Sequence, residues 1–327
     1  MPNHGIVDLF SGAGGISVGA MMANKRIRPA VAVDLDEDAL ASYAANIGGV
    51  AMRGDLTDAQ FRRDVIREAR AAGATIVVGG VPCQGFSGLN NQRKNAHYSL
   101  RNDLLPRAFF DVVFALKPAL VMMEEVPNFP KDKLDSFAKQ LQRRGYLTKS
   151  AVLNAKDYGA PQSRRRLILV AARDAAVIAN FPPPPTHPTP VSVAEALGAL
   201  ADRGVPRPVS ETAERWVRMR ETIDPVTGRD KLILAKPRWF KASCGVVDPT
   251  KPSPTLTTHL HAAGAGTFTL KRPDGAYTAL TAEEARCLQS FPPSFHFTGR
   301  PASVYRQIGN SVPPKLAAGV FEALALP

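Results

Sequence analysis

The fold is decided by the stretch Gly5-Ile6-Val7-Asp8-Leu9-Phe10-Ser11-Gly12-Ala13-Gly14-Gly15 near the N-terminus. Its first five residues form a short apolar run typical of a buried strand, and residues 16–23 have a helical pattern. Three glycines lie between them, so the backbone can pass close to a ligand that lies over the N-terminus of the helix. This order predicts nucleotide binding, and the glycine pattern alone favours NAD and S-adenosylmethionine equally.

The first half of the chain continues to alternate short apolar runs with helical patterns. We predict strands at residues 5–9, 30–33, 75–78, 119–123 and 167–171. We predict helices between them at residues 16–23, 37–46, 59–71, 104–116 and 133–144. This order is typical of a parallel sheet covered by helices on both faces, so the predicted fold class is α/β with a doubly wound, Rossmann-like domain.

A domain boundary is predicted where six prolines fall within residues 181–190, because such a segment forms neither a helix nor the interior of a sheet. Beyond this linker, helical patterns occur at residues 191–200, 211–221, 281–288 and 314–324. The runs in residues 231–258 are short and interrupted by proline and glycine, and they predict no particular fold.

Composition favours a nucleic-acid partner and a chain that does not span a membrane. The net charge is +12, with a basic region at residues 203–241 and an acidic cluster at residues 34–38, which suggests one surface for nucleic acid and another for a small cofactor. No apolar run approaches 18 residues, and no secretory signal is visible at the N-terminus. The three cysteines form no CxxC pair, so we expect neither a disulfide framework nor a metal site.

Three further motifs carry side chains suited to catalysis. Gly79-Gly80-Val81-Pro82-Cys83-Gln84-Gly85-Phe86-Ser87 places a thiol on a loop after a strand, although a lone cysteine is often a small buried hydrophobe. Glu124-Glu125-Val126-Pro127-Asn128 ends a later strand. The third motif, Gln162-Ser163-Arg164-Arg165-Arg166, precedes another strand. Alternation along that strand sends Arg164 and Arg166 to one face. The alternative is that these arginines form an ordinary basic strand edge.

Together these motifs resemble the cytosine-C5 DNA methyltransferases of bacterial restriction-modification type, in the family's order from Ile6 to about Val312. The resemblance implies a Rossmann-like, S-adenosylmethionine-dependent methyltransferase domain at residues 1–180 plus 303–327. A smaller DNA target-recognition domain with a hinge would occupy residues 181–302. It also implies a monomer in the bacterial cytoplasm, associated with the nucleoid, and a cognate restriction endonuclease that acts separately.

The implied reaction transfers a methyl group from S-adenosyl-L-methionine to C5 of cytosine in a short specific sequence of double-stranded DNA and leaves S-adenosyl-L-homocysteine. By resemblance, Cys83 adds to C6 of a flipped-out base, Glu124 gives a proton to N3, Arg166 contacts the base and Arg164 orients the site. The chain has Glu125 where the family usually has asparagine. Because adjacent residues at a strand end face opposite ways, only one of the two carboxylates can reach the base, and the alignment favours Glu124.

Cofactor residues are expected at the carboxyl ends of successive strands. The carboxylate of Asp34 can accept hydrogen bonds from ribose hydroxyls, and Asp55 can accept one from an adenine amino group, although each could also serve as a helix cap. Residues 307–314 resemble the family's last motif, which returns beside Phe10. The implied cofactor residues are Phe10, Ser11, Gly12, Gly14, Gly15, Asp34, Asp55, Pro82, Asn310 and Ser311.

DNA contacts are expected from two basic segments. Residues 85–101 are polar and glycine-rich and suggest a loop that closes over DNA and fills the gap left by the extruded base, with a solvated surface loop as the alternative. Residues 281–292 resemble the motif that organises the recognition domain. The predicted DNA-binding residues are Gln84, Ser87, Arg93, Lys94, Arg101, Lys236, Arg238 and Lys241. For the last three, a solvated basic loop explains the sequence as well as DNA binding does.

Three other functions remain open from the sequence. A eukaryotic branch of the same family methylates tRNA, but its Cys-Phe-Thr triplet is absent from the second half of this chain. A nucleic-acid-binding protein that has lost catalysis is a second alternative, which the presence of Cys83, Glu124 and Arg166 disfavours. A dinucleotide-dependent oxidoreductase is a third, and it offers no use for the Pro82-Cys83-Gln84 loop.

Overall fold

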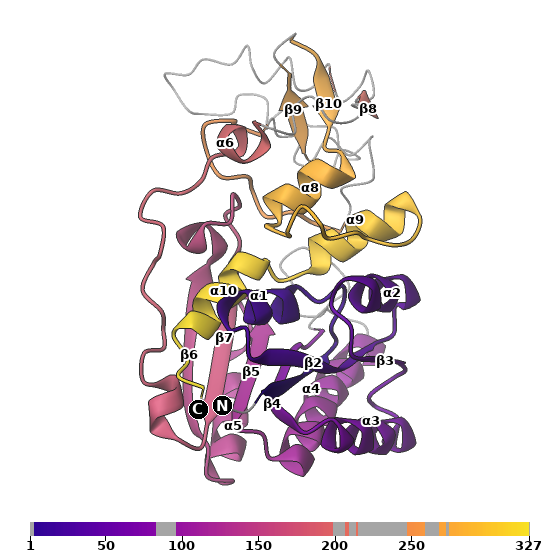
Figure 1. Ribbon diagram of the computed structural model, residues 1–327, viewed down its shortest axis with the longest axis vertical. Helices are drawn as coiled ribbons and strands as arrows, with labels where there is room; N and C mark the ends of the chain where they lie inside the picture. The colour runs from indigo at the N-terminus through magenta and orange to yellow at the C-terminus, as the bar shows by residue number, and fades with distance from the viewer. Residues whose placement is uncertain are drawn as a thin grey trace.

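The computed structural model describes residues 3–82, 96–198, 207–208, 214, 247–258, 268–272 and 275–326. A seven-stranded sheet with the order β3-β2-β1-β4-β5-β7-β6 forms its centre (Figure 1). Its strands are β1 (His4–Leu9), β2 (Ile27–Asp34), β3 (Val50–Arg53), β4 (Ala74–Gly80), β5 (Leu120–Glu125), β6 (Leu147–Asn154) and β7 (Arg165–Ala172). The α/β class and all five predicted strands are confirmed.

The sheet is not parallel throughout, which corrects the expectation from sequence. Strands β3, β2, β1, β4 and β5 run parallel, whereas β7 is antiparallel to both β5 and β6. The chain crosses from β5 through α5 (Lys131–Gln142) to the edge strand β6, and then returns through a short connection to β7 between them. A connection without a crossover helix joins antiparallel neighbours, and this fixes the direction of β7.

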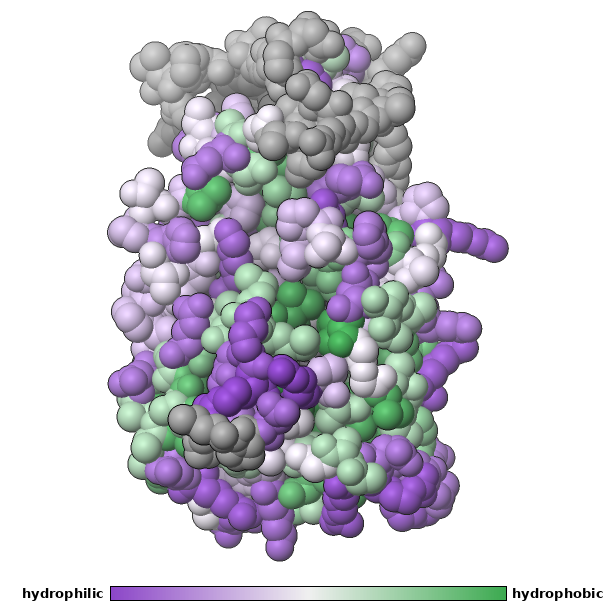
Figure 2. Space-filling model, in the orientation of Figure 1, coloured by the Kyte–Doolittle hydropathy of each residue, from purple (hydrophilic) through white to green (hydrophobic). Residues whose placement is uncertain are grey.

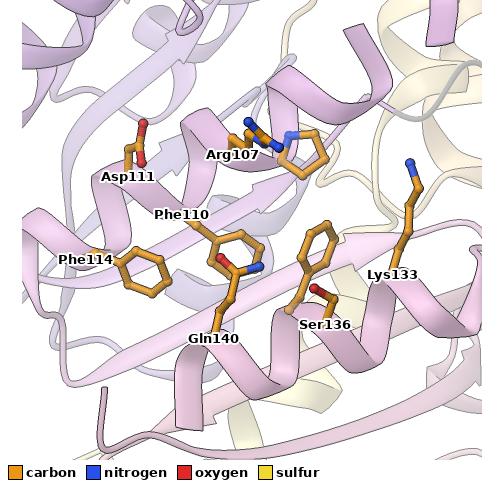
Figure 3. A pocket seen from close by; sticks show the side chains of 9 residues that line it. Arg107, Phe110, Asp111, Phe114, Lys133, Ser136 and Gln140 are labelled. Carbon is orange, nitrogen blue, oxygen red and sulfur yellow. The ribbon is translucent and has the colours of Figure 1, made fainter. Parts of the chain in front are cut away.

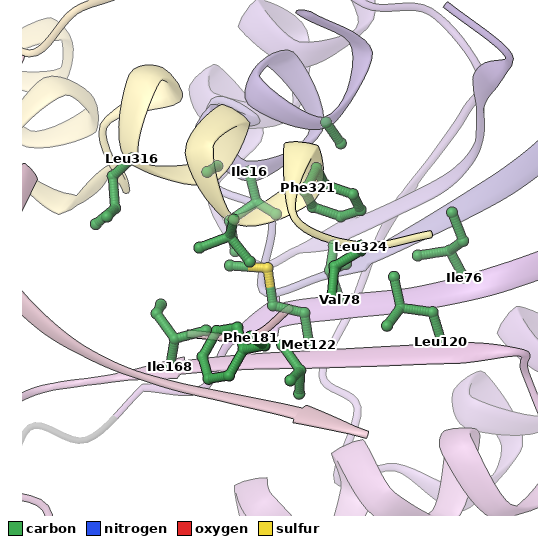
Figure 4. Packing of buried hydrophobic residues seen from close by; sticks show 14 of the residues in the cluster. Ile16, Ile76, Val78, Leu120, Met122, Ile168, Phe181, Leu316, Phe321 and Leu324 are labelled. Atoms are coloured by element: carbon green, nitrogen blue, oxygen red, sulfur yellow. The ribbon is translucent and has the colours of Figure 1, made fainter. Parts of the chain in front are cut away.

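Helices cover both faces of the sheet. Helices α1 (Gly15–Ala23) and α10 (Pro314–Glu322) cover one face, and α3 (Ala59–Ala71), α4 (Ala96–Leu116) and α5 cover the other. Alternation along the strands supplies a core to each side, because successive side chains point to opposite faces. Figure 4 shows the first core, to which the helices contribute Ile16, Leu316 and Phe321 and the strands contribute Ile76, Leu120 and Met122.

Local signals explain where these helices begin. Helix α2 (Glu37–Asn46) starts after Asp36, whose carboxylate accepts from the backbone N–H groups of Asp38 and Ala39. Helix α3 starts in the same way after Asp58, which accepts from the N–H of Phe61. Both helices have the predicted bounds, whereas α4 begins eight residues before its predicted start and α5 begins and ends two residues early.

The C-terminal segment returns to the N-terminal part of the chain. Helix α9 (Pro301–Asn310), which the sequence did not predict, leads into α10, and α10 packs against α1. Glycine at position 15 is required for this packing, because an added Cβ would overlap the carbonyl oxygen of Val312. The guanidinium of Arg26 donates to the carbonyl of Leu326, and the two chain ends lie close together in Figure 1.

A second lobe, defined here as the described residues 192–300, surrounds a core to which α9 of the C-terminal segment also contributes. It contains α6 (Val193–Leu197), β8 (Arg207–Pro208), β9 (Thr269–Lys271), β10 (Tyr277–Ala279) and α8 (Ala282–Leu288). Its core residues are Val193, Leu197, Val247, Leu256, Phe268, Leu270, Leu280, Ala285, Leu288, Tyr305 and Ile308. The predicted helices near α6 and α8 are confirmed, α6 being shorter than expected, and the one at 211–221 lies outside the described residues apart from residue 214. The predicted boundaries of the two domains stay a prediction.

The described surface is mixed in character. On the face drawn in Figure 2, hydrophilic and apolar residues are interspersed. None of the helices in the described part of the chain combines the length and apolar character needed to span a membrane.

Candidate active site

The carboxyl ends of the parallel strands meet at one edge of the sheet, as expected for a doubly wound fold. Gly80 at the end of β4 pairs in register with Glu124 at the end of β5. A Cβ added at Gly80 would lie 3.0 Å from Oε2 of Glu124, so the carboxyl group is next to the chain that leads to Cys83. Cys83 itself, predicted to be the nucleophile, lies outside the described residues.

Glu124 and Arg166 form an ion pair at this edge. Nε of Arg166 lies 2.7 Å from Oε1 of Glu124, and the two side chains are 14% and 13% exposed. Limited solvent access strengthens the attraction between them and still leaves polar atoms open to a ligand. Two of the predicted catalytic residues are therefore brought together by neighbouring strands, β5 and β7.

Glu125 lies on the opposite side of β5 and is almost fully buried, with 2% of its surface exposed. Its Oε2 accepts a hydrogen bond from the backbone N–H of Val126. The strand alternation thus separates the two adjacent carboxylates as expected, and Glu124 is the one that pairs with Arg166.

Arg164 is buried, while Arg165 is exposed, in agreement with the predicted alternation. The guanidinium of Arg164 donates to the backbone carbonyls of Leu256, Gly309 and Asn310. Burial lowers the pKa of this guanidinium well below its ordinary value, and the neighbouring positive charge of Arg166 adds to the effect. Arg164 therefore joins backbone segments, and its predicted orienting role stays a prediction.

The glycine-rich turn and Asp34 are joined by hydrogen bonds. The N–H of Gly12 donates to Oδ2 of Asp34 at 2.8 Å, and the N–H of Asp36 donates to Oδ1 at 2.9 Å. Burial raises the pKa of Asp34, while these bonds oppose the shift. Gly12 has a φ of +52° and no atom within 4 Å of an added Cβ, and Phe10 before it has a positive φ of 56°, which is rare for a bulky side chain.

A buried network that the sequence did not predict supports this turn. Ser17 Oγ donates to Oδ2 of Asp8 at 2.6 Å, and the hydroxyl of Tyr43 donates to Ser17 Oγ at 2.9 Å, so β1, α1 and α2 are tied together. Burial raises the pKa of Asp8 to about 7, the bond from Ser17 opposes this, and the charge of Asp34 adds to it. A carboxylate inside an apolar strand was the signal that could have indicated such a network.

The remaining predicted cofactor residues lie along the same edge or in the returning C-terminal segment. Asp55 follows β3, where its Oδ1 accepts from the N–H and hydroxyl of Thr57, and Pro82 is the last described residue after β4. Asn310 is exposed at the end of α9. Ser311 is 7% exposed, and its hydroxyl donates to the carbonyl of Gln307.

The residues at this edge fit S-adenosylmethionine. The space above Gly12 admits a ligand, and the carboxylate of Asp34 suits ribose hydroxyls. Leu35, which the sequence did not single out, is 51% exposed beside Asp34 and offers an apolar surface to a flat ring. An exposed leucine beside a carboxylate at a strand end was the available signal.

The predicted DNA contacts are not described at the level of side chains. Gln84, Ser87, Arg93, Lys94, Lys236, Arg238 and Lys241 all lie outside the described residues. Arg101 belongs to α4, and its side chain is likewise outside the description.

A hollow of about 640 Å³ lies between α4 and α5 (Figure 3). Phe110, Phe114 and Phe137 form its aromatic part, and Arg107 and Lys133 are among its charged lining residues. None of its lining residues belongs to the predicted site.

Solved structures share this architecture along almost the entire chain. The Entamoeba histolytica methyltransferase EhMeth aligns with a TM-score of 0.73 and 18% identity, covering 99% of this chain and 98% of that one. The S. pombe Dnmt2 methyltransferase aligns with a TM-score of 0.69 and 17% identity, covering 98% of both chains. The fold is therefore that of Rossmann-like methyltransferases.

Sequence comparisons identify the family. The model of the C-5 cytosine-specific DNA methylases matches residues 5–325. The type II methyltransferase M.XorII of Xanthomonas oryzae pv. oryzae is 33% identical, over 96% of this chain and 82% of its own length. The type II methyltransferase M1.HphI of Haemophilus parahaemolyticus is 30% identical, over 97% and 86%. The chain belongs to the C-5 cytosine-specific DNA methylase family and is a DNA cytosine methyltransferase, as the motifs predicted.

Proposed function

We propose that this protein transfers a methyl group from S-adenosylmethionine to C5 of cytosine within a short specific sequence of double-stranded DNA, by covalent addition of Cys83 to a flipped-out base. The Glu124–Arg166 ion pair beside Gly80 carries the proposal, because it sets an acid and a hydrogen-bond donor next to the end of β4, three residues before Cys83 in the sequence. A cytosine ring inside a duplex is out of reach of such a pair, so the base must leave the stack.

The chemistry assigns a separate task to each side chain. C5 of cytosine is a poor nucleophile, and addition of the Cys83 thiolate to C6 moves electron density onto C5. Glu124 gives a proton to ring N3 during this addition, and the guanidinium of Arg166 holds the base carbonyl and the carboxyl group together. When bound, S-adenosylmethionine supplies the electrophilic methyl group. The C5 proton is then lost to water, the C6–S bond breaks and the N3 proton returns to Glu124, which restores the ring and the thiolate.

The cofactor is held at the carboxyl edge of β1, β2 and β3 in this proposal. Asp34 accepts from the ribose hydroxyls, Asp55 accepts from the adenine amino group, and Leu35 lies against the ring. The open space over Gly12 supports this assignment, as does the proximity of the returning C-terminal segment to Gly15.

Target recognition is assigned to the second lobe. A net charge of +12 favours binding to the phosphates of DNA, which sets affinity, while a few side chains read base edges. The relatives named above are type II methyltransferases, which supports a place in a restriction-modification system. We extend the proposal to a monomer in the bacterial cytoplasm whose cognate endonuclease acts separately.

Nucleoside mass spectrometry tests the proposed reaction. Purified protein and S-adenosylmethionine are incubated with unmethylated duplex DNA several kilobases long, which contains most short recognition sequences, and separately with tRNA. We expect 5-methylcytosine in the DNA alone, and none with Cys83→Ala. Methylation of tRNA alone, or undiminished DNA methylation by Cys83→Ala, would contradict the proposal.

A further inference from the structure

Leu256 of the second lobe is held at both of its backbone polar groups. Its N–H donates to Oε1 of Gln162 at 3.0 Å, and its carbonyl accepts from the guanidinium of Arg164 at 3.0 Å. Gln162 and Arg164 alternate along the segment that leads into β7, so their side chains reach the same neighbour. The next residue in this alternation is Arg166, which pairs with Glu124.

The segment around Leu256 is also held through its backbone. The N–H of Ser163 donates to the carbonyl of Ser253, and the N–H of Ser253 donates to the carbonyl of Pro161. The hydroxyl of Thr255 donates to the carbonyl of Ser163 at 2.8 Å. Residues 253–256 thus form a strand-like contact with the lead into β7.

A chain of two buried glutamines continues from Gln162. Its Nε2 donates to Oε1 of Gln289 at 2.6 Å, and Nε2 of Gln289 donates to the carbonyl of Ser311. Both glutamines are fully buried. The amide orientations follow from the network, because the Leu256 N–H requires an oxygen from Gln162, and the Ser311 carbonyl requires a donor from Gln289.

The C-terminal segment is in direct contact with the same part of the second lobe. Arg164 donates to the carbonyls of Gly309 and Asn310, so both routes from the lead into β7 end at residues 309–311. A Cβ added at Gly309 would lie 2.5 Å from the carbonyl of Thr257, which leaves no room for a side chain between the two segments.

We propose that Gln162 and Gln289 are positioning residues for methyl transfer. Through Leu256 and Ser311 they hold the second lobe in register with the Glu124–Arg166 pair and the C-terminal segment. DNA engaged by the second lobe is thereby set against the reacting groups at a fixed distance. This inference rests on the proposed function, in which the second lobe binds the target DNA.

Single-turnover rates test this role at saturating DNA and S-adenosylmethionine. We expect Gln162→Met and Gln289→Met each to lower the rate of methyl transfer by about 10- to 100-fold, because a displacement on the order of 1 Å has effects of this size. Binding of S-adenosylhomocysteine and DNA changes by less than about threefold, since uniform binding is retained. The double variant is about as slow as the slower single variant, because both act through one chain of bonds.

The matched control is Gln142→Met, the same change at an exposed position of α5, for which the rate stays that of the unchanged protein. Thr255→Val gives a milder variant should Gln162→Met fail to fold, because it removes one exposed hydrogen bond and preserves side-chain shape. We expect Thr255→Val to lower the rate by about two- to tenfold with binding unchanged. Folded variants that transfer methyl at the full rate, or that lose only binding, would contradict the inference.

Hydrogen exchange gives a readout that does not depend on the reaction. Gln162→Met or, if needed, Gln289→Met should speed amide exchange within residues 253–257, whereas Gln142→Met should not. Absence of methyl transfer by the unchanged protein contradicts the proposed function. Full activity of the variants alongside an active unchanged protein contradicts the positioning role.

Discussion

Gly80 and Glu124 are paired in register on β4 and β5, and an added Cβ at Gly80 would lie 3.0 Å from the Glu124 carboxylate. The absence of a side chain at position 80 lets this carboxyl group lie beside the backbone that continues to Cys83. The pairing is set by two parallel strands rather than by loops, so the acid occupies a rigid position at the edge of the sheet.

The two adjacent glutamates should differ in their effect on catalysis. Glu124→Gln removes the proton donor and the partner of Arg166, and we expect methyl transfer to fall about 100-fold or more. Glu125→Gln alters a buried group on the other side of β5, and its rate should fall much less. Rates of 5-methylcytosine formation for the two purified variants provide the measurement. The reverse ranking would overturn the assignment of Glu124.

Arg166 should require a guanidinium and not merely a positive charge. Arg166→Lys keeps the charge but loses the planar group that approaches Glu124 at 2.7 Å, so the single-turnover rate should fall about tenfold or more. Arg165→Lys is the matched control, because Arg165 is exposed and points away, and its rate should stay within about twofold. Equal single-turnover rates for both variants would contradict the assignment of Arg166 to the active site.

Asp34 should control cofactor affinity. In the unchanged protein two backbone N–H groups donate to the carboxylate of Asp34. In Asp34→Asn one of them faces an amide NH₂ group, which cannot accept a hydrogen bond, and the charged acceptor for the ribose hydroxyls is lost. We expect the dissociation constant of S-adenosylhomocysteine, measured by calorimetry, to rise about tenfold or more. Asp58→Asn is the control, since asparagine caps α3 equally well. An unchanged constant in Asp34→Asn would contradict the cofactor site.

Asp8 should make the stability of the fold depend on pH. Its pKa is raised to about 7 in the folded chain from an ordinary value of 3.8, with Ser17, Asp34 and Tyr43 as its polar neighbours. The folded state therefore holds a proton that the unfolded state has released between these values, and this contribution to stability is lost as pH rises toward and through 7. The slope is at most about 1.4 kcal/mol per pH unit.

Asp8→Asn isolates this contribution, because its side chain stays neutral and can still accept from Ser17. Urea unfolding of both proteins from pH 5 to pH 8 gives the difference in free energy of unfolding. The free energy of unfolding of the variant should increase relative to that of the unchanged protein as pH rises. Parallel curves over this range would show that Asp8 does not titrate as described.

The sequence predicted the elements whose signals are local. Helix α3 was predicted with its observed bounds, because Asp58 caps it and one face is periodically apolar. A strand end was expected at Asp55, but the bounds of β3 were not predicted, and β6 was not predicted at all. Both strands lie at the edges of the sheet, and most of their side chains are exposed or partly exposed. The direction of β7 could not be predicted either, since an apolar run indicates that a strand is buried but not whether it is parallel or antiparallel to its neighbours.

The site was predicted to the extent that its residues follow strand ends. Glu124 and Asp34 could be found in this way, because parallel strands bring their carboxyl ends to one edge. Arg166 reaches the same edge from the start of the antiparallel strand β7, and its motif was found by resemblance to the family. The pairing of Gln162 with Gln289 spans 127 positions of sequence, and no local pattern marks two buried amides as partners. The Asp8–Ser17–Tyr43 network likewise depends on packing between three elements.

Covalent trapping tests the central claim most directly. In duplex DNA made with 5-fluorocytosine, the proton that must leave C5 is replaced by fluorine, so the bond between Cys83 and C6 cannot be released after methyl transfer. With S-adenosylmethionine present, we predict a protein–DNA complex that survives denaturation, whose peptide mass places the bond at Cys83, and none with Cys83→Ala. A complex formed by Cys83→Ala, or none formed by an enzyme that methylates ordinary DNA, would contradict the account.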